Sequence, residues 1–161
     1  MRAREQRGRA YVWNGNYERA FEDFDAALKL DPKSPSTFAA RGFAFLRQGN
    51  YAAANQEFDA AIQLNPANPL SFIERGVVHY QEKNYEMSIR DLDYAIELDP
   101  AEGATFAFRA EVYRAMGDKE RAIRNYDEAI RLGFKGAVEQ RRAITSGMAI
   151  MSGRSRISMQ R

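Results

Sequence analysis

The chain repeats itself every 34 residues, and this period constrains its fold more than any other feature of the sequence. Proline recurs at 32, 66 and 100, each time directly after Asp or Asn. Three further sets of identical residues follow the same grid: Gly8, Gly42 and Gly76; Arg7, Arg41, Arg75 and Arg109; Ala27, Ala61, Ala95 and Ala129. Four units therefore follow one another without insertions, at 1–34, 35–68, 69–102 and 103–136. A fixed period of this length is typical of repeat architectures, in which each unit contacts only its neighbours.

Each unit has the pattern of two helices joined by a short turn. The first helix of the second unit carries Phe38, Phe45 and Leu46 at helical spacing. Glycine follows at 15, 49 and 117, where a left-handed residue ends a helix. Lys83 stands at this place in the third unit and predicts a turn that is costlier or differently shaped. Asn or Asp then caps the second helix, which ends before the repeated proline because proline disfavours helix at the residue before it.

These units resemble the tetratricopeptide repeat, a helix pair with the pattern W-x2-L-G-x2-Y…A-x3-F…P. The second unit carries that pattern as Phe38, Arg41, Gly42, Phe45, Ala54, Phe58, Ala61 and Pro66. Arg stands in every unit where the family usually has Leu, and this Arg-Gly variant is similar to bacterial repeats. The resemblance spans 136 of the 161 residues. It implies an all-α fold, a right-handed superhelix (α-solenoid) of four helix-turn-helix units.

The two ends of the chain differ from the repeated body. Residues 137–151 continue the grid as a first helix without a partner, and we expect a capping helix over the fourth unit, with Ala143, Ile144 and Ile150 facing inward. Residues 152–161 are basic, and we expect a disordered tail there. Both ends carry net positive charge around an acidic middle, yet the whole chain carries only +2. This balance disfavours a strongly basic nucleic-acid domain.

The composition contains few of the Cys and His residues that serve as catalytic nucleophiles, bases or metal ligands. Cysteine is absent and the one histidine, His79, falls at an aromatic packing position, so we expect no thiol nucleophile, metal site or cofactor and no enzyme. Glycine-rich phosphate loops are also absent. No apolar stretch is long enough to span a bilayer, and the first ten residues lack the apolar core of a secretory signal, which favours a cytoplasmic location.

By resemblance, the first helices of such an array line a concave groove that binds ligands. The residues that we expect to form this binding groove are Arg9, Trp13, Phe43, Leu46, Arg47, Ile73, Val77, Tyr80, Phe108, Glu111 and Arg114. Family members that clamp a C-terminal carboxylate use Lys and Asn at positions 5 and 9 of a unit. No unit here has that pair, so we expect no carboxylate clamp.

An apolar and aromatic groove favours a non-catalytic scaffold or adaptor that binds a peptide or amphipathic helix of a partner protein. Other hypotheses stay open. The chain's own tail can fill the groove, or two copies can associate through the groove or the capping helix. Less favoured is binding of RNA or an anionic surface through the basic ends. We further expect the repeated arginines to pair with the acids of the same grid, which are Asp25, Asp59, Asp93 and Asp127.

Overall fold

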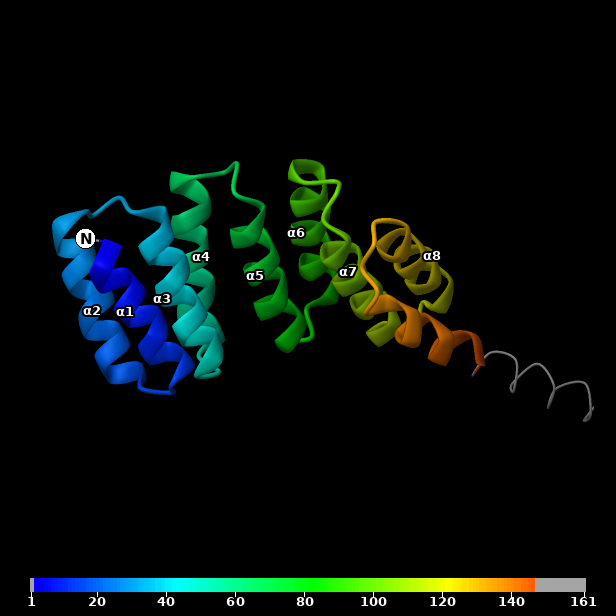
Figure 1. Cartoon of the computed structure of the whole chain (residues 1–161), viewed down its shortest axis with the longest axis horizontal. Coiled ribbons are helices and arrows are strands. Elements are labelled where there is room, and N and C mark those ends of the chain that lie inside the picture. The colour runs from blue at the N-terminus through cyan, green and yellow to red at the C-terminus, as the bar shows by residue number, and fades with distance from the viewer. Residues whose placement is uncertain (1, 147–161) are drawn as a thin grey trace, which may run out of the picture. The chain divides into compact units, whose positions relative to one another are not determined.

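A computed structural model of the chain describes residues 2–146, which are helical apart from short turns (Figure 1). The eight helices with defined bounds are α1 (Arg2–Trp13), α2 (Tyr17–Leu30), α3 (Pro35–Arg47), α4 (Tyr51–Leu64), α5 (Pro69–Gln81), α6 (Tyr85–Leu98), α7 (Gly103–Ala115) and α8 (Lys119–Arg131). Residues 137–146 are also helical, and no strand occurs in the range described. The predicted all-α fold of helix-turn-helix units is confirmed, with one helix pair in each predicted unit.

The described helices form two compact units. The first unit contains α1–α6 and ends at Leu98, and the second begins at Asp99 with α7. Within the first unit, α3 contacts both α1 and α5, so the first helices of three successive pairs are neighbours. In the second unit, α7 packs against α8.

The turns within the helix pairs follow the predicted chemistry. Gly15, Gly49 and Gly117 adopt left-handed conformations, with φ between 73° and 83°. Lys83 takes the same conformation with φ of 60°, although its side chain makes that region costly. The side chain of Asn16 then accepts a hydrogen bond from the backbone N–H of Arg19, 3.2 Å away. Equivalent caps are made by Asn50 on α4 and Asp118 on α8.

The repeated glycines allow the two helices of a pair to approach closely. A Cβ atom at Gly8 would lie 2.6 Å from Cε1 of Phe24, and one at Gly42 would lie 3.0 Å from Cε1 of Phe58. Both phenylalanine rings are fully buried. In the third pair the aromatic ring is replaced by Leu92, and a Cβ at Gly76 would meet nothing closer than 3.4 Å. Close packing is therefore tightest where glycine faces a ring.

The predicted pairing of arginines with acids is confirmed between successive pairs of the first unit. Arg41 on α3 bonds Asp25 on α2 at 2.7 Å, and Arg75 on α5 bonds Asp59 on α4 at 2.5 Å. Each bond joins a first helix to the second helix of the preceding pair. The arginines therefore link successive helix pairs, as well as the two helices within a pair.

The same arginines bind a second acid within their own pair, which the sequence analysis missed. Arg75 donates from Nε and Nη2 to Asp91 at 2.9 and 2.6 Å, and Asp91 is only 2% exposed. Arg41 binds Glu57 in the same bidentate way. In the second unit Asn125 replaces the acid and accepts from Arg109 at 2.8 Å. A planar guanidinium suits such bidentate contacts.

The helix at 137–146 covers part of the second unit. Ala137 and Ile144 on this helix are buried, and Arg141 forms an ion pair with Asp127 on α8. The prediction for Ile144 is confirmed, whereas the prediction for Ala143 is wrong, since this residue is exposed. The docked face follows Ala137, Arg141 and Ile144 at helical spacing, and Ala143 lies outside it. The rest of the expected capping helix (147–151), including Ile150, and the expected tail (152–161) lie outside the described residues.

Candidate functional site

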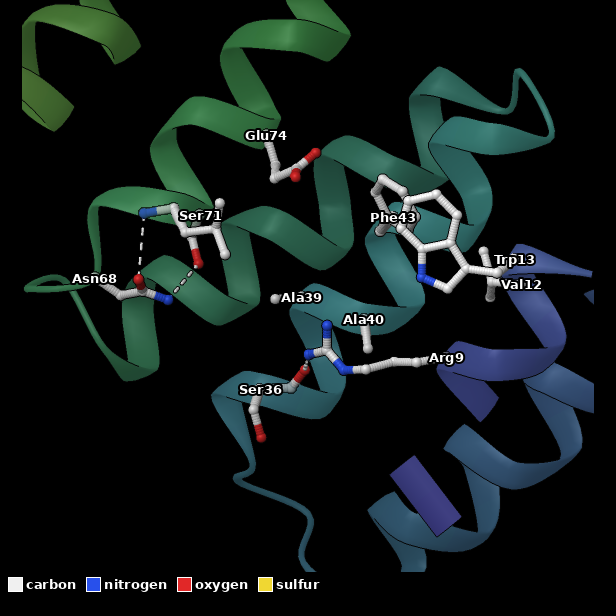
Figure 2. A pocket seen from close by; sticks show the side chains of 11 residues that line it. Arg9, Val12, Trp13, Ser36, Ala39, Ala40, Phe43, Asn68, Ser71 and Glu74 are labelled. Atoms are coloured by element: carbon white, nitrogen blue, oxygen red, sulfur yellow. Dashed lines mark hydrogen bonds between the residues drawn. The ribbon is translucent and has the colours of Figure 1, made fainter. Parts of the chain in front are cut away.

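The first helices of the first unit bound a pocket of about 290 Å³ (Figure 2). Helix α3 lies between α1 and α5 and contacts both. The pocket is lined by Arg9, Val12, Trp13, Ser36, Ala39, Ala40, Phe43, Asn68, Leu70, Ser71 and Glu74. Three residues that the sequence predicted for the groove, Arg9, Trp13 and Phe43, therefore line one space.

A second hollow of about 470 Å³ adjoins the first along α3 and α5. It is lined by Phe43, Leu46, Arg47, Tyr51, Glu74, Val77 and Gln81. Phe43 and Glu74 belong to both hollows. We refer to the two hollows together as the groove. Three more predicted residues, Leu46, Arg47 and Val77, contribute to it.

Aromatic rings form one wall of the groove. The ring of Trp13 on α1 lies against that of Phe43 on α3, with 5.6 Å between the centroids and a tilt of 47°. The guanidinium of Arg47 lies over both rings, 5.4 Å from the Trp13 centroid and 5.9 Å from the Phe43 centroid. Trp13 is nevertheless 68% exposed. The wall thus offers an open aromatic face next to an apolar hollow.

Arg9 is held at the rim by contacts that fix α1 on α3. The buried carboxylate of Glu5 accepts from Arg9 Nε at 3.2 Å, from the Ser36 hydroxyl at 2.8 Å and from the Thr37 hydroxyl at 3.3 Å. Arg9 Nη2 also donates to the backbone carbonyl of Ser36 at 3.2 Å (Figure 2). The guanidinium is thus engaged by partners within the protein.

Glu74 is the acidic residue of the groove, and it was not among the residues predicted for it. Its carboxylate extends from α5 into the space between α5 and α3 (Figure 2). No hydrogen bond or ion pair reaches this carboxylate from any residue between 2 and 146. Burial raises the pKa of Glu74, and the charge of Arg9 offsets this only in part. One sequence signal was available, because the second and fourth 34-residue repeats have the uncharged Ala40 and Phe108 at the position of Glu74.

Ile73 and Tyr80, also predicted for the groove, line neither of its two hollows. Both are half-buried on α5. The ring of Tyr80 packs against that of Tyr85 at the start of α6, with 5.8 Å between the centroids. This contact places the ring of Tyr80, near the C-terminal end of α5, against the start of α6.

The last three predicted residues, Phe108, Glu111 and Arg114, belong to α7 in the second unit. Glu111 accepts from Arg114 Nε at 2.9 Å and from the hydroxyl of the buried Tyr126 at 2.9 Å. These donors, Arg114 first, hold the pKa of Glu111 below its ordinary value, while burial and Glu111 raise the pKa of Tyr126. Glu111 therefore joins α7 to α8, Arg114 pairs with Glu111 along α7, and Phe108 is half-buried.

Between residues 2 and 146 no group of three or more His, Asp or Glu side chains is arranged to hold a metal ion. Within the same range no helix is long and apolar enough to cross a bilayer.

Comparison with known families identifies one kind of repeat along most of the chain. Residues 8–49 match a profile described as TPR repeat. Residues 39–103 and 105–132 match two profiles described as Tetratricopeptide repeat. A comparison with curated proteins gives no match.

Solved structures with a similar fold include those of MamA, pilF and RPAP3. A crystal structure of MamA is 20% identical, covers 88% of this chain and 84% of its own, and has a TM-score of 0.77. A structure of pilF from Pseudomonas aeruginosa is 23% identical, with coverages of 91% and 68% and a TM-score of 0.84. The first TPR of Spaghetti (RPAP3), bound to the HSP90 peptide SRMEEVD, is 20% identical, with coverages of 74% and 96% and a TM-score of 0.68. At these identities the likeness concerns the fold.

Proposed function

The chain belongs to the tetratricopeptide repeat family, and we propose that it is a non-catalytic scaffold that binds a peptide or helix of a partner protein in the groove between α1, α3 and α5. The observation that carries this proposal is the open aromatic wall. Trp13, 68% exposed, stands beside Phe43 at the mouth of an apolar hollow. Contiguous exposed apolar surface marks interaction sites, and tryptophan and arginine dominate the binding energy of many interfaces.

The shape of the groove suits a chain segment with more than one anchor. Its two hollows adjoin along α3 and α5 and share the side chains of Phe43 and Glu74. An extended peptide or an amphipathic helix presents side chains at regular intervals, so two neighbouring anchors can occupy the two hollows at once.

The similar structure of RPAP3 with its HSP90 peptide supports the idea that such a fold holds a peptide. The groove residues here call for a different peptide chemistry. At positions 5 and 9 the second 34-residue repeat has Ala39 and Phe43, and the third repeat has Ile73 and Val77. These pairs lack the Lys and Asn that clamp a terminal carboxylate, so apolar contacts take the larger share of the binding energy.

A paired capture experiment tests this proposal. The groove variant carries Trp13→Glu and Leu70→Glu, both at exposed positions that line the first hollow, so the fold tolerates the change. The matched control is Leu30→Glu on α2, at a leucine 63% exposed that lines neither hollow of the groove. Circular dichroism first confirms that all three proteins are folded.

The proposal predicts that a protein from source-cell lysate is captured by the wild-type chain and by the control, and lost with the groove variant. Capture that is equal for all three would place the binding surface elsewhere and contradict the proposal. The other hypotheses from the sequence stay predictions. Sedimentation at two concentrations separates self-association from partner binding, and a steep salt dependence would mark binding through the basic ends.

A further inference from the structure

We propose that the groove selects a segment with a Lys or Arg side chain, whose cationic head pairs with Glu74 while its aliphatic stem packs against Phe43 and Trp13. The proposal names the chemistry of the partner, and it rests on the function proposed above. It assigns a role to the one acidic side chain that lines both hollows.

The carboxylate of Glu74 has no ion-pair partner among residues 2–146. This half-buried carboxylate lies in a hollow walled in part by Ala39, Ala40 and Phe43, where an ionised group loses some of its hydration. No donor between residues 2 and 146 contacts it. Glu74 is half-buried, and a partly desolvated charge gains from a partner, so a ligand that brings a cationic donor adds a charge-assisted hydrogen bond.

The two arginines of the groove do not supply this pairing. Arg9 is held by Glu5 and by the carbonyl of Ser36. Arg47 lies over the rings of Trp13 and Phe43. Both guanidinium groups are thus positioned on the walls, and the space in front of Glu74 is left for a ligand.

The aromatic wall favours a cationic side chain over a neutral donor. The long stems of Lys and Arg pack along apolar surface while the charged head keeps its polar contacts. Cations are also attracted to the faces of tryptophan and phenylalanine rings. The ring of Phe43 lines both hollows together with Glu74, so a single Lys or Arg can use the ring and the carboxylate at once.

The test selects binders without knowledge of the natural partner. A library of random peptides is displayed and selected on the 161-residue chain, and the affinity of a selected peptide is then measured by calorimetry. We expect the selected peptides to share a Lys or Arg with apolar neighbours. Replacing that residue by Met should weaken binding to the wild-type chain by about tenfold to a hundredfold, as for the loss of a charged hydrogen bond.

A double-mutant cycle decides whether Glu74 is the partner of that cation. Against Glu74→Gln, the same change of Lys or Arg to Met should cost far less than it costs against the wild-type chain, because the pairing is already lost. Glu74→Lys should reverse the preference and favour a peptide with Glu at that position. An equal loss against wild type and Glu74→Gln, or peptides without a shared cation, overturns the proposal.

Control variants separate this proposal from the function on which it rests. If the selected peptides bind the Trp13→Glu variant as tightly as the Leu30→Glu control, the groove is not the binding surface and the proposed function fails. If they need the groove but not Glu74, only the present proposal fails.

Two further outcomes assign the groove to a different occupant. If changing Arg154 and Arg156 to Gln in the full chain raises peptide affinity about tenfold or more, the chain's own C-terminal segment competes for Glu74. If the chain forms a dimer that Glu74→Gln dissociates, a second copy is the occupant. Either result overturns the assignment to a partner protein.

Discussion

Alanine at each repeated glycine provides a graded test of the packing within the helix pairs. Gly8, Gly42 and Gly76 all lie inside first helices, where Ala is favoured over Gly by roughly 1 kcal/mol. They differ in the room for a Cβ atom. At Gly76 the nearest atom is 3.4 Å away, an ordinary contact, so Gly76→Ala should keep most of the gain and stabilise the protein by about 0.5–1 kcal/mol.

At the other two glycines the new methyl group meets a buried phenylalanine ring. The distance is 2.6 Å at Gly8 and 3.0 Å at Gly42, so the ring of Phe24 must move and that of Phe58 must shift slightly. Overpacking of this kind costs about 1–3 kcal/mol, which exceeds the gain in helix propensity at Gly8. We therefore expect stability to rise in the order Gly8→Ala, Gly42→Ala, Gly76→Ala.

Urea unfolding, followed by circular dichroism, measures the free energy of unfolding of the three variants. Hydrogen exchange then localises each effect, because the helix pairs of a repeat protein need not unfold together. The double variant Gly8→Ala with Phe24→Leu is the control, since it copies the Gly76–Leu92 arrangement and should relieve the clash. A Gly8→Ala variant as stable as Gly76→Ala would refute the packing argument.

Three further predictions follow from single residues. Arg75→Met leaves Asp91, only 2% exposed, as a buried charge without its bidentate partner, and should cost about 3–5 kcal/mol in urea unfolding; a loss below about 1 kcal/mol contradicts this. Because burial raises the pKa of Glu74 in the folded chain, its ionised form opposes folding at neutral pH, and this opposition disappears as the pH falls through that raised pKa toward the ordinary value of 4.5. Glu74→Gln should therefore raise the free energy of unfolding at neutral pH by about 0.5–2 kcal/mol, which is seen as a higher Tm. The Tm values of the wild-type chain and the variant should converge in acid, and a Tm difference that does not depend on pH contradicts the raised pKa of Glu74. Lys83→Gly should stabilise the turn after α5 by about 0.5–1 kcal/mol in thermal unfolding, whereas Lys83→Ala should not, because only glycine adopts a φ of 60° without strain.

The sequence predicted those features of the fold that depend on local rules. The glycine turns, the Asn and Asp caps and the pairing of Arg41 with Asp25 all follow from repeat position alone. The missing glycine at Lys83 is visible in the repeat alignment, but the turn keeps the left-handed conformation of the glycine turns, so the prediction of a different shape is wrong and the higher cost stays a prediction.

Features that depend on the angle between packed helices were not predicted. Ala143 is exposed because the helix at 137–146 docks through another face. The second acid that binds Arg75, Asp91, lies on α6, and its contact depends on how α6 packs against α5. Glu74 was not among the predicted groove residues, because its partial desolvation and its lack of a hydrogen-bond partner arise only when α3 and α5 come together.

The emission of Trp13 tests the central claim most directly. Trp13 is the only tryptophan in the chain, it is 68% exposed, and it lines the groove, so its fluorescence reports on that surface. A partner that binds in the groove should shift the emission to shorter wavelengths and protect Trp13 from acrylamide quenching, with a midpoint equal to the calorimetric Kd. A partner that binds at the same Kd while the emission and the quenching of Trp13 stay unchanged would contradict the claim that the groove is the binding site.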